Sequence, residues 1–451
     1  MRTLISGGRV IDPATHTDAE LNILIENGKV CLVTRDTPSA DRVIDATGMI
    51  VCPGFIDLHM HEDPVADGAI QPCIFTTMLH MGVTTVVGGN CGSNLYDPIE
   101  YLDIADRQGI PVNVSLLAGH GTFRKKAGAR DKYGKATLAQ REQMQACLKK
   151  ALEAGCAGIS FGLRYYPGTD DDEFYRAVSC CAGTGKLITA HIRDDAAHVF
   201  DAIAETADAG KSFGVPVQIS HIGSMGGFGQ MADVLRMTDE YRMNGLDIML
   251  DCYPYNAFST SLGATTYDDG WLERYNCGYD VLEYCEGEWA GKRADAESFS
   301  RLRNEFPDCL TVCHVMRQED IDLAYRHPSV LIASDGILSN GQGHPRAAGT
   351  FPRVFAQYVR TGKLSLYDAI AKMTSRPAQR MRLADKGTLQ VGADADITVF
   401  NPETIRDNAT FASPIMPPDG IEYVLIGGEI ALDHGQEINT RLGRAVRVAN
   451  R

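Results

Sequence analysis

Residues 51–61 read VCPGFIDLHMH, an apolar run that predicts a buried strand and ends in two histidines separated by one residue. Alternate residues of a strand point to the same side, so His59 and His61 can both face one end of a sheet. The residues before and after this segment have different patterns. We therefore take it as the start of a central domain.

After this segment, apolar strand-like runs alternate with helical patterns, which is typical of parallel βα units. Eight strands are predicted near residues 50–58, 84–90, 111–118, 156–162, 186–192, 216–222, 247–254 and 329–334. Eight units over about 330 residues favour a closed (β/α)8 barrel over an open sheet. The stretch 263–328 predicts an insertion between the seventh and eighth strands, and Ser365 predicts the N-cap of the last barrel helix.

Short strands separated by glycine turns occupy both ends of the chain. LISGGRVID and NILIENGKVCLV near the N-terminus share this character with GTLQVGADADITVF and GIEYVLIGGEIAL near the C-terminus. Neither end has enough strands for a core of its own. The expected fold is therefore α/β: a TIM-type barrel over residues 53–383, and one small β-sandwich assembled from residues 1–52 and 384–451.

The composition narrows the class of protein. The chain of 451 residues carries a net charge of -15, which argues against nucleic acid or an anionic membrane as a partner. No apolar run reaches the ~18 residues of a membrane helix, and the first residues lack the apolar region of a secretory signal. The 13 cysteines are scattered and odd in number, which predicts reduced thiols and a cytoplasmic location.

The ends of the predicted strands carry residue types that bind metals. These residues are His59, His61, Cys91, His191, His221 and Asp335. Catalytic residues of such barrels lie at the C-terminal ends of the strands, and this mixture of imidazole, thiolate and carboxylate favours zinc. Taken one at a time, each of these residues could equally be a buried structural residue, such as a core histidine or a buried free cysteine. Their coincidence at strand ends predicts a metal centre.

Two other segments invite a functional interpretation. His120, in AGHGTFR after the third strand, either contacts the substrate or holds its loop. GSMGGFG at residues 223–229 lacks the spacing and the lysine of a phosphate-binding loop, so we interpret it as a mobile loop over the site.

The motifs resemble those of a known family. VCPGFIDLHMH is similar to the opening motif of the amidohydrolase superfamily, and GGNCGSN, AHIRDD, ISHIG, DCYPYNAFST, SDG, GHPRAAGTFPR and KMTSRPAQR together resemble the N-acyl-D-amino-acid deacylases, or D-aminoacylases. Cys91 is the most specific mark. It takes the place that a carboxylated lysine on strand four holds in hydantoinases and dihydroorotases, and here that strand has no lysine.

This resemblance implies a set of roles. One tightly bound zinc is held by Cys91, His191 and His221, and a second, weaker metal position lies near His59, His61 and Asp335. The substrate's α-carboxylate is bound by Tyr253, Ser259 and Arg346. The family often has a lysine two residues beyond His221, where this chain has Gly223. That departure leaves the side-chain specificity open.

The predicted function is hydrolysis of the amide bond of N-acyl-D-amino acids, with a small-molecule substrate and Asp335 as general base. The planar guanidinium of Arg346 would hold the carboxylate bidentately; its alternative role is an ion pair that holds the loop after strand eight. Two other functions stay open: a cyclic amidase of the hydantoinase or dihydroorotase type, and a non-catalytic binding barrel. The oligomeric state is left open.

Overall fold

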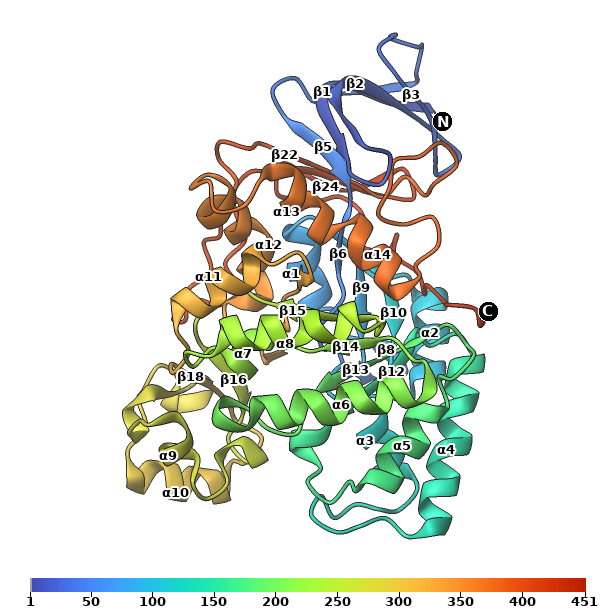
Figure 1. Ribbon diagram of the computed structural model, residues 1–451. Helices are drawn as coiled ribbons and strands as arrows, with labels where there is room; N and C mark the ends of the chain where they lie inside the picture. The colour runs from blue at the N-terminus through green and yellow to red at the C-terminus, as the bar shows by residue number, and fades with distance from the viewer. Residues whose placement is uncertain (1) are drawn as a thin grey trace.

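Parallel strands form a closed barrel in the computed structural model, which describes residues 2–451 (Figure 1). The strands in order are β6 (Phe55–Asp57), β9 (Val83–Gly88), β10 (Asn113–Leu116) with its continuation β11 (Ala118–Gly119), β12 (Gly158–Gly162), β13 (Leu187–His191), β14 (Val217–Ile219), β15 (Ile248–Cys252) and β19 (Val330–Ile332). The ends of β6 and β19 meet where the His61 amide donates to the Gly336 carbonyl at 2.9 Å. The predicted (β/α)8 barrel is confirmed.

Helices surround the strands. They are α1 (Ile74–His80), α2 (Pro98–Gln108), α3 (His120–Lys126), α4 (Leu138–Glu153), α5 (Asp171–Ser179), α6 (Val199–Phe213), α7 (Ile222–Gly226), α8 (Met231–Met243), α11 (Gln318–Arg326), α12 (Arg346–Val354), α13 (Leu366–Met373) and α14 (Ser375–Met381). Helix α13 begins as predicted, because the Asp368 amide donates to the Ser365 hydroxyl at 3.0 Å. None of the helices among the described residues is long and apolar enough to span a bilayer.

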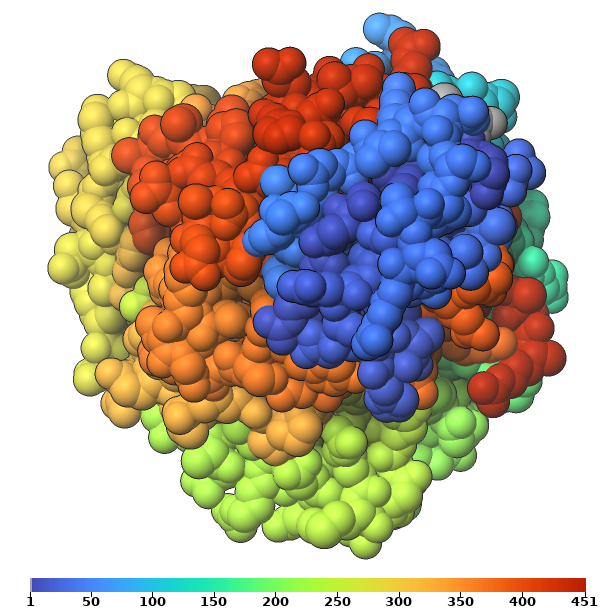
Figure 2. Space-filling model, turned by 90° about the horizontal axis from the view of Figure 1, so that it is seen from above, coloured from blue at the N-terminus to red at the C-terminus, as the bar shows by residue number. Residues whose placement is uncertain are grey.

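Both termini build one β unit, as the sequence indicated. Its strands are β1 (Arg2–Asp12), β2 (Thr17–Glu26), β3 (Lys29–Thr34), β4 (Arg42–Asp45), β5 (Ile50–Pro53), β22 (Ile397–Phe400), β23 (Ile421–Ile426), β24 (Glu429–Asp433) and β25 (Gln436–Glu437). They form a single hydrogen-bonded sheet in which β5 pairs with β22 and so joins the two ends of the chain. Figure 2 shows the two ends packed side by side on one face.

The predicted first strand, 50–58, is split between the two units. Residues Ile50–Pro53 belong to the terminal sheet and Phe55–Asp57 to the barrel. Gly54 lies between them, where a Cβ would be 2.1 Å from the Thr84 hydroxyl oxygen. The glycine allows the chain to pass this close to β9, so one continuous apolar run serves two sheets.

An insertion lies between the seventh and eighth strands, but its sheet begins at Phe258, before the predicted range 263–328, and α11 within that range packs against β19 and α8 of the barrel. Its strands β16 (Phe258–Ser261), β17 (Leu282–Tyr284) and β18 (Leu310–Cys313) form an antiparallel sheet, accompanied by α9 (Trp271–Tyr275) and α10 (Ala296–Glu305). An aromatic cluster packs α9 on α10, with the rings of Trp271 and Phe299 5.4 Å apart. Two short hairpins also occur, β7 (Val65–Ala66) with β8 (Ala69–Ile70), and β20 (Leu338–Ser339) with β21 (Gln342–Gly343).

Candidate metal centre and active site

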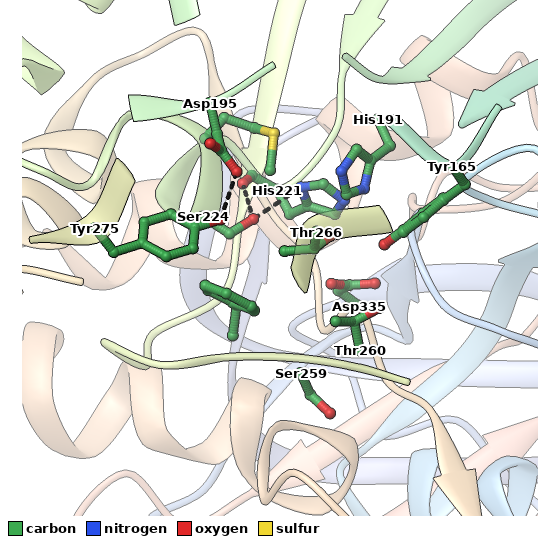
Figure 3. Close-up of a pocket in the computed structure, with 12 residues that line it drawn as sticks. Tyr165, His191, Asp195, His221, Ser224, Ser259, Thr260, Thr266, Tyr275 and Asp335 are labelled. Atoms are coloured by element: carbon green, nitrogen blue, oxygen red, sulfur yellow. Dashed lines mark hydrogen bonds between the residues drawn. The ribbon is translucent and has the colours of Figure 1, made fainter. Parts of the chain in front are cut away.

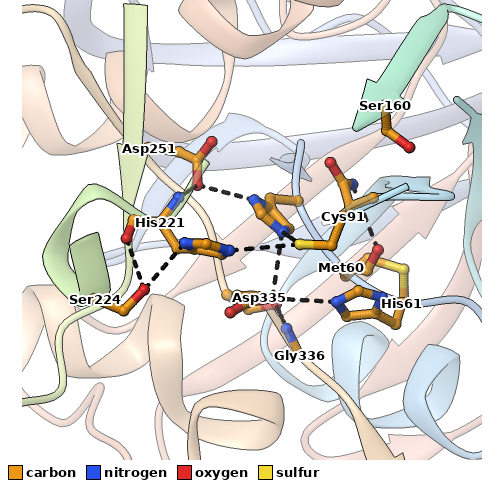
Figure 4. Close-up of polar contacts among 12 residues, drawn as sticks. Met60, His61, Cys91, Ser160, His221, Ser224, Asp251, Asp335 and Gly336 are labelled. Atoms are coloured by element: carbon orange, nitrogen blue, oxygen red, sulfur yellow. Dashed lines mark hydrogen bonds and ion pairs between the residues drawn. The ribbon is translucent and has the colours of Figure 1, made fainter. Parts of the chain in front are cut away.

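Four predicted metal ligands converge at the C-terminal ends of the barrel strands. The donor atoms of His59, Cys91, His221 and Asp335 all lie within 4.8 Å of one another, and all four residues are buried. Cys91 Sγ is 3.5 Å from His59 Nε2 and 3.4 Å from His221 Nε2 (Figure 4). Asp335 Oδ1 lies 3.3 Å from His59 Nε2. Residues from four strands therefore present sulfur, nitrogen and oxygen donors to one point.

The backbone at these strand ends is unusual. Cys91, His221 and Asp335 have φ values of 52°, 34° and 49°, in the left-handed region that residues other than glycine rarely adopt. Gly92 continues the turn after Cys91 with a φ of 77°, and a Cβ there would lie 2.6 Å from the amide nitrogen of Gly162. Such conformations are concentrated at functional sites. They turn each side chain into the barrel mouth directly after its strand.

Asp251, to which the sequence analysis gave no role, orients the ring of His59 and holds the backbone at His221. His59 Nδ1 donates to Asp251 Oδ1 at 3.0 Å, and the His221 amide donates to the same oxygen at 2.7 Å. The other oxygen, Oδ2, accepts from Gln218 Nε2 at 3.0 Å, and Gln218 Oε1 accepts from Arg380 Nε at 3.1 Å. A buried hydrogen-bonded chain thus runs from the metal donors into the barrel. Such outer partners fix the ring orientation of metal-binding histidines.

Ser224 is a second residue that the sequence analysis missed. It lies in GSMGGFG, and the interpretation of this segment as a mobile loop is wrong, because its first residues belong to the short buried helix α7. Ser224 Oγ is 3.0 Å from His221 Nδ1. His221 therefore directs Nε2 toward Cys91, with its other ring nitrogen held by the helix.

The two remaining predicted ligands adjoin this cluster. His61 Nε2 lies 3.2 Å from Asp335 Oδ1. The His191 ring centroid is 4.5 Å from that of His221, and its buried Nδ1 has no hydrogen-bond partner among the described residues (Figure 3). Burial and the nearby His221 lower the pKa of His191 to about 4. The ring is therefore neutral at pH 7, which is the form that binds a metal.

The donor chemistry fits a metal ion. Burial alone would raise the pKa of the Cys91 thiol, but the His59 and His221 rings outweigh burial and hold that pKa well below its usual value. A thiolate, several imidazole nitrogens and a carboxylate together form a donor set typical of zinc. The four donors that lie closest together come from both predicted metal positions: Cys91 and His221 from the tight one, and His59 and Asp335 from the weak one. The assignment of each ligand to a tight or a weak ion stays a prediction.

Strand β12 holds the loop that carries the cysteine. Its buried Ser160 accepts a hydrogen bond from the Gly92 amide at 3.1 Å and donates one to the Gly89 carbonyl. The strand-four side chain therefore fixes the loop that carries Cys91.

The predicted carboxylate-binding residues lie beside Asp335. Arg346 Nη1 is 2.9 Å from Asp335 Oδ2, although its N–H bonds are not aligned for a hydrogen bond, and the guanidinium lies 4.6 Å from the centre of the Tyr253 ring. Tyr253 Oη, Ser259 Oγ and Arg346 Nε are buried without a hydrogen-bond partner among the described residues. Buried polar atoms are normally satisfied, so three such atoms together indicate a place for a ligand.

Asp335 is ionised at this position. Burial would raise its pKa, but Arg346, His59 and His221 outweigh burial and hold the pKa well below its usual value. The ion pair with Arg346 also matches the alternative role considered for this arginine, because Asp335 ends the eighth strand. The contact is compatible with both roles.

Two chambers meet at Asp335. The outer one, of about 500 Å³, is lined by His61, Cys91 and Arg346 with apolar side chains of α1 and the β20–β21 hairpin. The inner one, of about 20 Å³, is lined by residues shown in Figure 3: Tyr165, His191, Asp195, His221, Ser224, Ser259, Thr260, Thr266, Tyr275 and Asp335. Tyr165 lines both chambers and was not foreseen, since no motif marks it.

His120 lies outside both chambers. Its Nε2 is 3.0 Å from Glu173 Oε1, and Arg124 Nε donates to the same oxygen at 2.9 Å. All three side chains are buried. Of the two roles considered for His120, the contact with Glu173 favours the structural one, and its role in substrate binding stays a prediction.

Comparison with known proteins places this geometry in a family. A family model described as the amidohydrolase family matches residues 281–432. An N-acyl-D-glutamate deacylase of Alcaligenes xylosoxydans xylosoxydans is 32% identical over 94% of this chain and 92% of its own length. The N-acyl-D-glutamate deacylase of Bordetella bronchiseptica, solved with zinc and a phosphonate inhibitor that mimics the tetrahedral intermediate, superposes with a TM-score of 0.88 at 29% identity over 99% of both chains.

A solved D-aminoacylase superposes with a TM-score of 0.89 at 29% identity, over 100% of this chain and 99% of that one. These relatives match the barrel, the terminal sheet and the insertion together, because the coverage spans the whole chain. The chain therefore belongs to the N-acyl-D-amino-acid deacylase, or D-aminoacylase, family of the amidohydrolase superfamily.

Proposed function

We propose that the protein hydrolyses the amide bond of N-acyl-D-amino acids with the help of bound zinc. One observation carries this proposal: Asp335 lies between the metal donors and the arginine, 3.3 Å from His59 Nε2 on one side and 2.9 Å from Arg346 Nη1 on the other. A substrate whose carboxylate pairs with Arg346 thereby has its amide beside the donor cluster. The names of the relatives, deacylases of N-acyl-D-amino acids, support the same substrate class.

The metal would be held by the strand-end cluster. We assign the tighter position to Cys91, His191 and His221, and a second, weaker position to His59, His61 and Asp335, as the family resemblance implies. When bound, zinc supplies a Lewis acid for the amide carbonyl and lowers the pKa of water toward about 7. The orphaned Nδ1 of His191 and the thiolate character of Cys91 support this assignment.

The chain's own residues provide recognition and proton transfer. Arg346, Tyr253 and Ser259 bind the α-carboxylate through the three polar atoms that have no partner in the described structure. Asp335 accepts a proton from the attacking water and donates it to the departing amine nitrogen, so the C–N bond breaks without expulsion of an amide anion. Its lowered pKa keeps this carboxylate ionised, and so available as a proton acceptor, and makes the protonated form quick to release that proton.

The inner chamber suggests which amino acid the enzyme takes. At about 20 Å³ it has room for little more than one water molecule, so it fits a small side chain. Asp195 Oδ2 accepts from Tyr275 Oη at 2.7 Å, while Asp195 Oδ1 has no hydrogen-bond partner among the described residues. An acidic side chain would place a second carboxylate beside it.

The missing lysine fits this proposal. A Cβ at Gly223 would lie 2.7 Å from Ile321 Cδ1 and 3.0 Å from Cys252 Sγ, so a larger residue has no space there without rearrangement. Arg346 is then the one lysine or arginine among the residues that line the two chambers. We propose a single carboxylate clamp and a preference for small, uncharged D-amino acids.

A substrate screen with metal analysis tests the proposal. Metal-replete protein is assayed on N-acetyl and N-formyl forms of D- and L-alanine, D-serine, D-leucine and D-glutamate, beside hydantoin and dihydroorotate. We expect bound zinc, turnover of the D-alanine and D-serine derivatives, and at least tenfold lower kcat/KM for the D-glutamate derivative. Ring opening without deacylation would establish a cyclic amidase instead. If the protein retains no zinc and turns over none of these substrates, the alternative of a non-catalytic binding protein with the barrel fold would be supported instead.

A further inference from the structure

A second pocket, of about 540 Å³, lies at the end of the barrel opposite the metal donors. It is lined by residues at or just before the start of β13, β14, β15 and β19, among them Leu187, Pro216, Asp247 and Pro328, and by helix α14. Five arginines face it: Arg242, Arg376, Arg380, Arg382 and Arg451. Asp247 is the one carboxylate among its described lining residues. In a chain with a net charge of -15, this is a local excess of positive charge.

Most of these arginines lack an anionic partner. Arg380 Nη1 lies 2.6 Å from Asp247 Oδ1, and Arg376 Nη2 lies 3.3 Å from Asp368 Oδ1. Arg242, Arg382 and Arg451 form no ion pair within 4.0 Å in the described part of the chain. Asp247 is itself 64% exposed, so water screens its charge.

The fold holds the side chains of Arg380 and Arg382 at this pocket, whereas Arg242 and Arg451 are exposed at its edge. Arg380 is almost completely buried, and Arg382 Nη1 donates to the Thr184 carbonyl at 3.1 Å. Arg242 lies in the last turn of α8, and Arg380 and Arg382 lie on and directly after α14. The Arg451 backbone amide donates a hydrogen bond to the Thr184 carbonyl at 3.0 Å, in the loop before β13. Guanidinium groups therefore approach one cavity from three separate segments.

We propose that this pocket binds a small anion that carries a phosphate group. A tetrahedral phosphate offers enough oxygen atoms for several guanidinium groups at once, whereas a single carboxylate offers two. The volume lies within the range of small-molecule sites. A nucleic acid would need an extended basic surface, which the acidic chain does not provide. The inference does not rest on the proposed deacylase activity, since the pocket lies at the other end of the strands.

Calorimetric titration of the zinc-loaded protein with inorganic phosphate tests the proposal. The test variant is Arg242→Gln/Arg382→Gln, because neither residue has an ion-pair partner to lose. Arg380 is left intact, since it also supports the chain to Asp251. The matched control is Arg236→Gln, an exposed arginine of the same helix α8 that pairs with Asp233. Arg346→Met separates binding at the active site from binding at this pocket.

We expect saturable phosphate binding that the double variant weakens at least tenfold and that Arg236→Gln and Arg346→Met retain. Acetate should bind far more weakly than phosphate. The proposal is overturned by absence of phosphate binding to the unaltered protein, by equal affinity in the double variant, or by loss of binding in Arg346→Met. If the double variant does not fold, Arg242→Gln alone, at an exposed position, must still weaken binding.

Discussion

Replacement of Arg346 by methionine separates the two roles that the structure allows for this residue. Methionine keeps an unbranched apolar stem against Tyr253 and removes the charge. Hydrogen bonds to charged groups contribute about 1.5–3 kcal/mol each, and removal of a buried bidentate partner therefore costs about 3 kcal/mol in transition-state binding. At 1.36 kcal/mol per factor of ten, kcat/KM for N-acetyl-D-alanine should fall by roughly 150-fold. Arg346 is 1% exposed, so solvent does not reduce this figure much.

The comparison substrate is N-acetyl-D-alaninamide, which has the same amide but no carboxylate. For it, we expect a loss of less than about tenfold, since the arginine has nothing to bind. Arg346 also lowers the pKa of Asp335, so its removal raises that pKa. The acidic limb of the kcat profile should then move to higher pH, because Asp335 must be ionised to accept a proton. Equal losses for both substrates, with an unchanged melting temperature, would refute the carboxylate clamp and leave the ion pair with Asp335 as the role of Arg346.

Three further changes test other parts of the site and fold. Asp335→Asn should keep its fold and its tightly bound zinc, measured by elemental analysis, and lose at least about 100-fold in kcat; near-normal turnover would rule out the proton-transfer role. Asp251→Asn should weaken zinc binding by about 10- to 100-fold in competition with a chelator, and unchanged affinity would show that His59 and His221 need no outer partner. Ser365→Ala should cost about 1 kcal/mol of unfolding free energy by denaturant titration, and a neutral result would contradict the cap of α13.

The barrel was predictable because each parallel strand is buried on both faces and therefore reads as a continuous apolar run. The C-terminal ends of the predicted strands then indicated the candidate metal ligands, because in a barrel all of these ends lie at the same face. Several strands were predicted longer than they are, among them 216–222 for β14, and the strand predicted at 50–58 contains the Pro53–Gly54 junction where the chain changes sheet.

The outer partners of the metal ligands could not be predicted in the same way. Asp251 lies in the apolar run IMLDC, and a carboxylate there is a signal that a buried partner exists. Its partners His59 and His221 come from other strands, so the sequence does not show which side chains it contacts. Ser224 lay in a glycine-rich segment whose pattern suggested a loop. Its helix forms because packing against the barrel outweighs the low helix propensity of glycine.

The chain Arg380–Gln218–Asp251 has a practical consequence for engineering. In barrel enzymes the N-terminal face is the usual place to improve thermal tolerance, because changes there leave the chemistry alone. Here the N-terminal face of the barrel is connected to the metal ligands at the C-terminal face by hydrogen bonds through three buried side chains, Arg380, Gln218 and Asp251. An apolar replacement of any of these three residues leaves a buried charged group or a buried amide without its hydrogen-bond partner. Libraries aimed at α14 should therefore be screened for zinc retention as well as for melting temperature.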